Sequence, residues 1–205
     1  MALQNAIEKA REASMPKDNI ERAVARGSGP DADSDAYEAV TYEGYGPGGV
    51  AVLVEALTDN RNRTAADIRH IFTKNDGNLG STGAVAWQFE RRGFVFVEQD
   101  GVDIDELVIT AAEAGAEDVS IAENAYSVIV EPDSFLAVRN ALEGAGLKTV
   151  TTELTMVPNN LIGISDEALA RKLLRLMDDL EDNEDIQEAY ANFDIPDDLI
   201  ELVVG

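Results

Sequence analysis

The chain has 205 residues, 45% of them apolar, and a formal net charge of −24 at pH 7. This length allows one large or two small cores, and the apolar content is ordinary for a globular protein. The absence of cysteine and the presence of a single histidine exclude disulfides, thiolate catalysis, cysteine–zinc sites and histidine-pair metal sites. With no apolar run of about 18 residues and no signal-peptide pattern, we expect a soluble, cytoplasmic protein.

The charge is unevenly distributed along the chain. Residues 1–92 contain 11 Lys and Arg against 14 Asp and Glu, whereas residues 93–205 contain 5 against 26. Nucleic-acid binding requires cations that face phosphate groups, so the second half is a poor candidate for direct contact. Its acidic surface either aids solubility or binds a basic protein partner. We therefore expect any contact with nucleic acid to come from the first 92 residues.

Two short helices are predicted at the start of the chain, over residues 2–13 and 16–26, and Gly27 ends the second. Two helices with so little apolar surface cannot form a core alone, which indicates that a third helix is missing. Residues 1–29 are therefore predicted to be a helical hairpin, the remnant of a truncated N-terminal helical domain. The polar residues 30–36 are predicted to be a linker.

The next segment alternates strands with one helix. The predicted elements are strands at 37–43, 50–57 and 84–90 and a helix at 63–74. Gly46-Pro47-Gly48-Gly49 suits a type II turn, because proline fixes φ at the second position and glycine supplies the positive φ at the third. On the helix, Ala65, Ile68 and Phe72 form an apolar stripe for the sheet. Arg63, His70 and Lys74 fall on the opposite side, which we expect to face solvent or a partner.

A new unit begins at residue 93. Its predicted elements are strands at 94–98, 117–122, 126–131 and 147–157 and helices at 103–114 and 133–143. This is the βαββαβ order of ferredoxin-like domains. A helix over 166–180 and a strand near 185–193 then supply elements that the unit before residue 93 lacks. We therefore predict an α+β fold in which a ferredoxin-like domain, 93–157, is inserted into a second α+β domain made of 37–92 and 158–205.

Basic residues of the first half form three clusters. The candidate nucleic-acid-binding residues are Lys17, Arg22, Arg26, Arg61, Arg63, Arg69, His70, Lys74, Arg91 and Arg92. Arg91 and Arg92 are predicted to close the strand that follows the basic helix. The clusters form either one patch beside a helix N-terminus that is suited to phosphate, or salt bridges with neighbouring acids. Few aromatic residues lie among them, so stacking of bases is not indicated.

Other motifs have simpler interpretations. Gly44-x-Gly46-x-x-Gly49 matches the dinucleotide fingerprint, but a strand rather than a helix follows it, so we interpret it as a structural turn. The acidic run at residues 178–185 lacks the ligand spacing and glycine of a calcium loop and is interpreted as a solvated helix end. The lone His70 offers no catalytic relay. We predict no catalytic residue, no metal site and no cofactor.

Four stretches together resemble the YebC/PmpR family of bacterial gene-expression regulators, which includes a mitochondrial translational activator. They are MPKDNIERAVARG at 15–27, the segment 42–72, GNLGSTGAVAWQFERRG at 77–93 and LEDNEDIQEAYANFDIP at 180–196. The resemblance covers the whole chain, although family members usually carry roughly fifty further residues at the start, including a basic segment. The resemblance implies the same inserted-domain arrangement.

The resemblance implies a non-enzymatic regulator of gene expression, and we expect DNA binding through phosphate contacts. Some family members are instead described as translation factors that relieve ribosome stalling at proline-rich stretches, so ribosomal RNA and the ribosome are alternative partners. A small-molecule sensor is a further alternative, since clefts between α+β domains often hold ligands. An enzyme that uses only carboxylates is disfavoured. Sequence-specific base readout does not follow from these residues.

Overall fold

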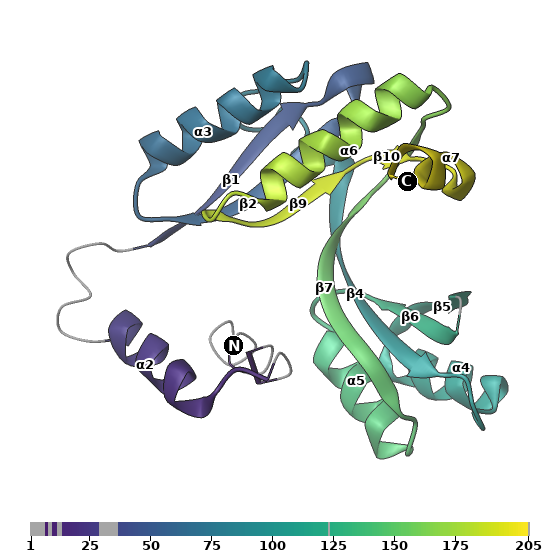
Figure 1. The fold of residues 1–205 in the computed structure, drawn as a ribbon. Coiled ribbons are helices and arrows are strands. Elements are labelled where there is room, and N and C mark those ends of the chain that lie inside the picture. The colour runs from purple at the N-terminus through teal and green to yellow at the C-terminus, as the bar shows by residue number, and fades with distance from the viewer. Residues whose placement is uncertain (1–6, 8–9, 12–13, 29–36, 123, 205) are drawn as a thin grey trace.

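The computed structural model describes residues 7, 10–11, 14–28, 37–122 and 124–204 (Figure 1). Its helices are α2 (Lys17–Ser28), α3 (Arg61–Lys74), α4 (Ile104–Ala114), α5 (Phe135–Gly144), α6 (Glu167–Glu181) and α7 (Asp197–Val204). Its strands are β1 (Glu38–Tyr45), β2 (Ala51–Thr58), β3 (Asn78–Leu79), β4 (Phe89–Glu98), β5 (Ala116–Ala122), β6 (Ala125–Val130), β7 (Thr149–Pro158), β8 (Ile162–Gly163), β9 (Ile186–Ala191) and β10 (Phe193–Asp194). No helix in these ranges is long and apolar enough to cross a membrane. The predicted helix at 2–13 lies largely outside the described residues, and the linker at 30–36 lies wholly outside them.

The first sheet has the strand order β3-β1-β2-β9, and its hydrogen-bonded neighbours are antiparallel. Its central strand, β2, is buried on both faces, which explains why its sequence is a nearly continuous apolar run. Val52 and Val54 pack against α3 and α6, which lie side by side over one face of the sheet (Figure 1). Ala51 and Leu53 point to the opposite face and form a smaller core with the segment before β4.

The second sheet has the strand order β5-β6-β4-β7 and is antiparallel throughout. With α4 and α5, its elements follow the βαββαβ order. Val95 and Val97 of β4 and Val128 of β6 are fully buried in one cluster with Leu107 of α4 and Leu142 of α5. The two helices thus cover one face of this sheet.

Strands β4 and β7 of the second sheet extend from that sheet toward the first one (Figure 1). The two strands are in register from Phe89 opposite Pro158 to Val97 opposite Thr149, with one irregularity near the end. Strand β9, which follows residues 93–157 in the chain, pairs with β2, which precedes them. An inserted domain requires such a pairing across it. We propose on this basis that residues 93–157 are an insertion into a domain made of the segments on either side.

The type II turn between β1 and β2 is present. The Gly49 backbone N–H donates to the carbonyl oxygen of Gly46 at 3.2 Å, and Gly48 has φ of +74° and ψ of 5°. These values match the third position of such a turn, where glycine avoids a steric penalty. The Gly-x-Gly-x-x-Gly pattern is thus a structural turn.

The predicted strand at 84–90 is wrong. Residues 84–88 form a turn and a short 3-10 helix (Ala86–Gln88), and β4 begins only at Phe89. The reason is that the carboxylate of Glu43 accepts the backbone N–H groups of Val85 and Ala86, so these donors are not available to a strand ladder.

The predicted break between strands at residues 91–93 is also wrong, because β4 runs through this segment to Glu98. Arg91 and Arg92 therefore lie inside a strand and do not close one. Gly93 has a packing role in that strand: a Cβ atom at this position would lie 2.5 Å from Cδ2 of Phe135 and 2.7 Å from Cγ2 of Val130. Its glycine permits the close approach of α5 and marks no turn.

Candidate nucleic-acid interface

Helix α3 carries five of the ten candidate residues. It begins after Asn60, whose side-chain oxygen accepts the backbone N–H of Arg63 at 3.1 Å and caps the helix. Ile68 and Phe72 are fully buried against the sheet. Asn62, Ala66, Arg69 and Thr73 share the opposite, exposed face at helical spacing, with His70 beside them. This outer face carries small or basic side chains.

Arg63 is held by acidic residues from distant parts of the chain. Its guanidinium donates to Asp59 at 2.8 Å and to both carboxylate oxygens of Asp185 at 3.1 Å. Asp185 also accepts the hydroxyl of Thr64 at 2.6 Å. That hydroxyl lowers the pKa of Asp185 against the opposing effect of burial, and Arg63 adds to the lowering. Arg63 therefore fastens the start of α3 to the turn before β9.

Lys74 is held in the same way at the end of α3. Its ammonium lies 2.9 Å from the carboxylate of Asp179 on α6, which also accepts the side-chain amide of Asn75. The amide and the ammonium together lower the pKa of Asp179. Arg63 and Lys74 thus lie on the exposed side of α3, as predicted, but both are already paired with carboxylates of this chain. Two acids of the run at 178–185, Asp179 and Asp185, pair with α3, so that run is not simply a solvated helix end.

Three more candidates are paired with carboxylates. Lys17 lies 3.5 Å from Glu21, and Arg61 lies 3.7 Å from Glu38, with all four side chains more than half exposed. Arg92 is the most enclosed of the three, with contacts at 2.8 to 3.1 Å that involve Glu90, Glu117 and Glu131. The alternative interpretation, salt bridges with acids of the chain, thus applies to five of the ten candidates.

The other five candidates are not seen in an ion pair within the part of the chain that the structure describes. Arg22, Arg69, His70 and Arg91 have exposed side chains, and none has an ion-pair partner among the described residues. The side chain of Arg26 lies outside the described part of the chain. The ten candidates lie on three elements, α2, α3 and β4. Arg69 and His70, adjacent on the outer face of α3, are the pair most available to phosphate.

A second feature was not predicted from the sequence. Buried Glu43 on β1 accepts the backbone N–H of Gly83 at 2.6 Å and those of Val85 and Ala86 at 2.7 Å. Burial alone would raise the pKa of this carboxyl, but the three donors outweigh it and lower the pKa. One carboxylate therefore fixes the shape of the loop between β3 and β4. The loop presents Trp87, the only tryptophan of the chain, which is 71% exposed.

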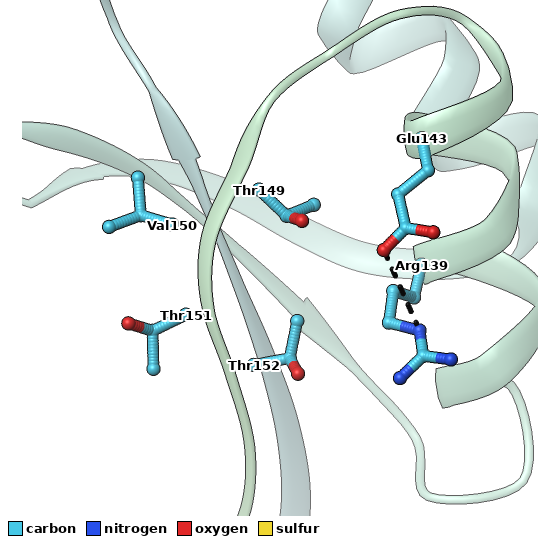
Figure 2. Close-up of a pocket in the computed structure, with 6 residues that line it drawn as sticks. All are labelled: Arg139, Glu143, Thr149, Val150, Thr151 and Thr152. Carbon is cyan, nitrogen blue, oxygen red and sulfur yellow. Dashed lines mark ion pairs between the residues drawn. The ribbon is translucent and has the colours of Figure 1, made fainter. Parts of the chain in front are cut away.

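A polar cavity of about 230 Å³ lies between α5 and the start of β7 (Figure 2). It is lined by Arg139, Glu143, Thr149, Val150, Thr151 and Thr152. Arg139 Nε is buried without a hydrogen bond and lies 3.8 Å from Glu143 Oε1. The cavity is smaller than ordinary ligand pockets and lacks their apolar lining. It is therefore not the apolar pocket that a small-molecule sensor would require.

The chain is a mixed α+β protein with two antiparallel four-stranded sheets, one of which carries a partly basic helix. The model of the family described as TACO1/YebC second and third domain matches residues 37–193. A probable transcriptional regulatory protein from Dictyoglomus turgidum is 54% identical over 97% of this chain and 80% of its own length. Another protein of that description, from Rubrobacter xylanophilus, is 52% identical over all of this chain and 81% of its own length.

A crystal structure of a conserved hypothetical protein from Aquifex aeolicus is similar, with a TM-score of 0.81 and 43% identity. The match covers 95% of this chain and 79% of that one. The chain belongs to the TACO1/YebC family.

Proposed function

We propose that this protein is a non-enzymatic regulator of gene expression that binds the phosphate backbone of DNA through the outer face of α3. The observation that carries the proposal is the exposed pair Arg69 and His70, which has no carboxylate partner among the described residues. The relatives are described as probable transcriptional regulatory proteins, which favours a role in transcription over the ribosome-associated alternative.

The local charge of α3 supports this role. The molecule has a net charge of −24, yet the helix itself contains four Lys and Arg, one His and a single acid, Asp67. Asn62, Ala66 and Thr73 flank Arg69 with short side chains, which permit close approach of a bulky duplex backbone. Contacts of this kind give affinity and orientation without reading sequence.

The structure also determines which substitution is informative. Reversing the charge of Arg63 would place a second carboxylate beside Asp185 and disrupt the start of α3, so lost binding would report lost folding. Arg69 is exposed, and its side chain has no ion pair among the described residues. Arg69→Glu therefore tests binding with little effect on stability.

We expect Arg69→Glu to weaken binding of a mixed-sequence DNA duplex and to reduce the slope of log K against log salt by about 1. Lys148→Glu is the control: it makes the same charge change just before β7, and the pair with Glu98 that it breaks is an exposed surface pair, which contributes little to stability. Fluorescence anisotropy from about 50 to 200 mM salt measures both quantities. If the two variants bind equally well, or if both keep the wild-type slope, the outer face of α3 is not the contact surface.

A further inference from the structure

Two exposed aromatic side chains meet at one carbonyl group. The Tyr45 hydroxyl donates to the carbonyl oxygen of Ala84 at 3.0 Å, and Trp87 Nε1 donates to the same oxygen at 3.2 Å. Tyr45 is 37% exposed and Trp87 is 71% exposed. These two residues are 42 positions apart, so their proximity cannot be inferred from the sequence pattern. The shared acceptor brings the Tyr45 hydroxyl and the Trp87 indole N–H to the same point of the surface.

Hydrogen bonds hold the backbone on both sides of Trp87. Glu43 fixes the loop that precedes Trp87 through three backbone hydrogen bonds. Asn159, between β7 and β8, donates its backbone N–H to the carbonyl oxygen of Gln88 at 2.8 Å and its side-chain amide to that of Trp87 at 3.3 Å. A ring whose surroundings are already ordered loses little conformational freedom when a ligand binds.

This surface carries almost no charge, although the molecule is strongly acidic. Residues 44–54, 77–89 and 154–165 contain no Asp, Glu, Lys, Arg or His. The pairing of β1 with β3 and the bonds of Asn159 bring the three segments together. Carboxylates on these segments would repel a polyanion, and none is present. The three segments themselves therefore add no repulsion of a polyanion, and the one carboxylate beneath the loop, Glu43, is offset by three backbone N–H donors.

The chemistry of the patch favours a nucleobase over an apolar protein surface. The polar atoms of both aromatic side chains are already bonded to Ala84, so the ring faces are what they offer to a ligand. Exposed Ser81, Thr82 and Asn159 on the same loops carry donors and acceptors of the type that pair with base edges. Arg91 follows Trp87 by four residues, at most about 14 Å along the chain, and is exposed without an ion pair among the described residues.

We propose that Trp87, with Tyr45 beside it, stacks on an unpaired base of a single-stranded nucleic acid, and that Arg91 binds a neighbouring phosphate. The proposal rests on the proposed function, since it assumes a nucleic-acid partner, but it assigns a second contact that is separate from α3. A duplex keeps its bases stacked and paired, so this site discriminates in favour of single strands or unpaired segments.

Trp87 provides its own probe, because it is the only source of tryptophan fluorescence. We expect a mixed-sequence single-stranded 12-mer to quench that fluorescence on binding, whereas the matching duplex leaves it nearly unchanged. Trp87→Leu should weaken single-strand binding by about 5- to 140-fold, the range for loss of one stacked base. Trp87→Tyr retains a stacking ring and should recover most of the affinity. Neither variant should alter duplex binding, which Arg69→Glu reduces.

The outcomes separate the two proposals. If the wild-type chain binds neither the single strand nor the duplex, the proposed function fails and the stacking proposal fails with it. If the duplex binds through Arg69 while the single strand neither quenches Trp87 nor responds to Trp87→Leu, the stacking proposal alone is overturned. A fluorescence change that follows protein concentration and not nucleic acid would make the patch an interface between copies of this chain, which also overturns it.

Discussion

Replacing Glu43 with glutamine removes one charge from the buried carboxylate that shapes the loop before β4, with almost no change in volume. The carboxylate accepts Gly83 N–H on one oxygen and both Val85 and Ala86 N–H on the other. A glutamine has one accepting oxygen, so its NH2 group must face at least one backbone donor. The substitution therefore leaves a buried N–H group unpaired and weakens the remaining bonds, which lose their ionic partner.

The expected cost is about 2–4 kcal/mol. An unsatisfied buried donor accounts for about 1–3 kcal/mol, and the lost charge assistance of the other bonds adds roughly 1 kcal/mol. Since each 1.4 kcal/mol is about tenfold, amide hydrogen exchange at Gly83, Val85 and Ala86 should lose roughly 30- to 700-fold of its protection. Exchange measured by NMR at each amide reports this local opening without assuming that the whole chain unfolds in one step.

The effect has a defined pH dependence. The pKa of Glu43 is lowered in the folded protein, so the stabilisation by the carboxylate is complete above its unfolded pKa of about 4. It is lost as pH falls through the folded pKa. The difference between wild type and Glu43→Gln should therefore be constant near neutral pH and shrink below about pH 4. Glu38→Gln, on the same strand but exposed, is the control and should change protection little. Equal protection in the two variants at neutral pH would refute the role of the carboxylate.

Two further substitutions test the packing of α5 on β4 and the bond between Asp185 and the start of α3. Gly93→Ala should lower the free energy of unfolding, measured by urea denaturation, by about 1–3 kcal/mol, because the added methyl group collides with Phe135. Gly144→Ala is the control, since a Cβ atom there meets open space. Equal stability of the two variants would contradict the tight approach of α5 to β4. Asp185→Ala should cost about 1–3 kcal/mol at neutral pH, because it leaves Thr64 without its carboxylate. Since the pKa of Asp185 is lowered, that cost should shrink below about pH 4 in the same assay, and a cost that stays constant down to pH 2 would show that the ionised carboxylate is not its source.

Much of the secondary structure follows from the sequence because its signals are local. The helix predicted at 63–74 is observed at Arg61–Lys74, and the strand predicted at 185–193 is observed at Ile186–Ala191. Apolar periodicity and capping residues act over one or two turns of chain, so they can be read without knowing the fold. Short elements were missed: α7 spans eight residues, and β3, β8 and β10 span two each.

The errors arose where a distant side chain decides the local structure. Residues 84–88 contain an apolar run that suits a strand, but the carboxylate of Glu43, 42 residues before Val85, accepts its backbone N–H. Gly93 lies between two predicted strands, but it is inside β4, where it allows Phe135 to approach. A single-sequence pattern contains neither fact, because both depend on which strands and helices become neighbours.

The amino-acid pattern alone is enough to locate the main helices and strands, the division of charge between the two halves and the family. Only the tertiary structure decided which charges remain available. The pairing of β9 with β2 brings Asp185 to Arg63 across 122 residues, and α6 brings Asp179 to Lys74, so two cations of α3 are neutralised while Arg69 is not. Tyr45 meets Trp87 for a similar reason. Charge and aromatic side chains act through distances in space, and those distances are set by sheet pairing and helix packing across the whole fold.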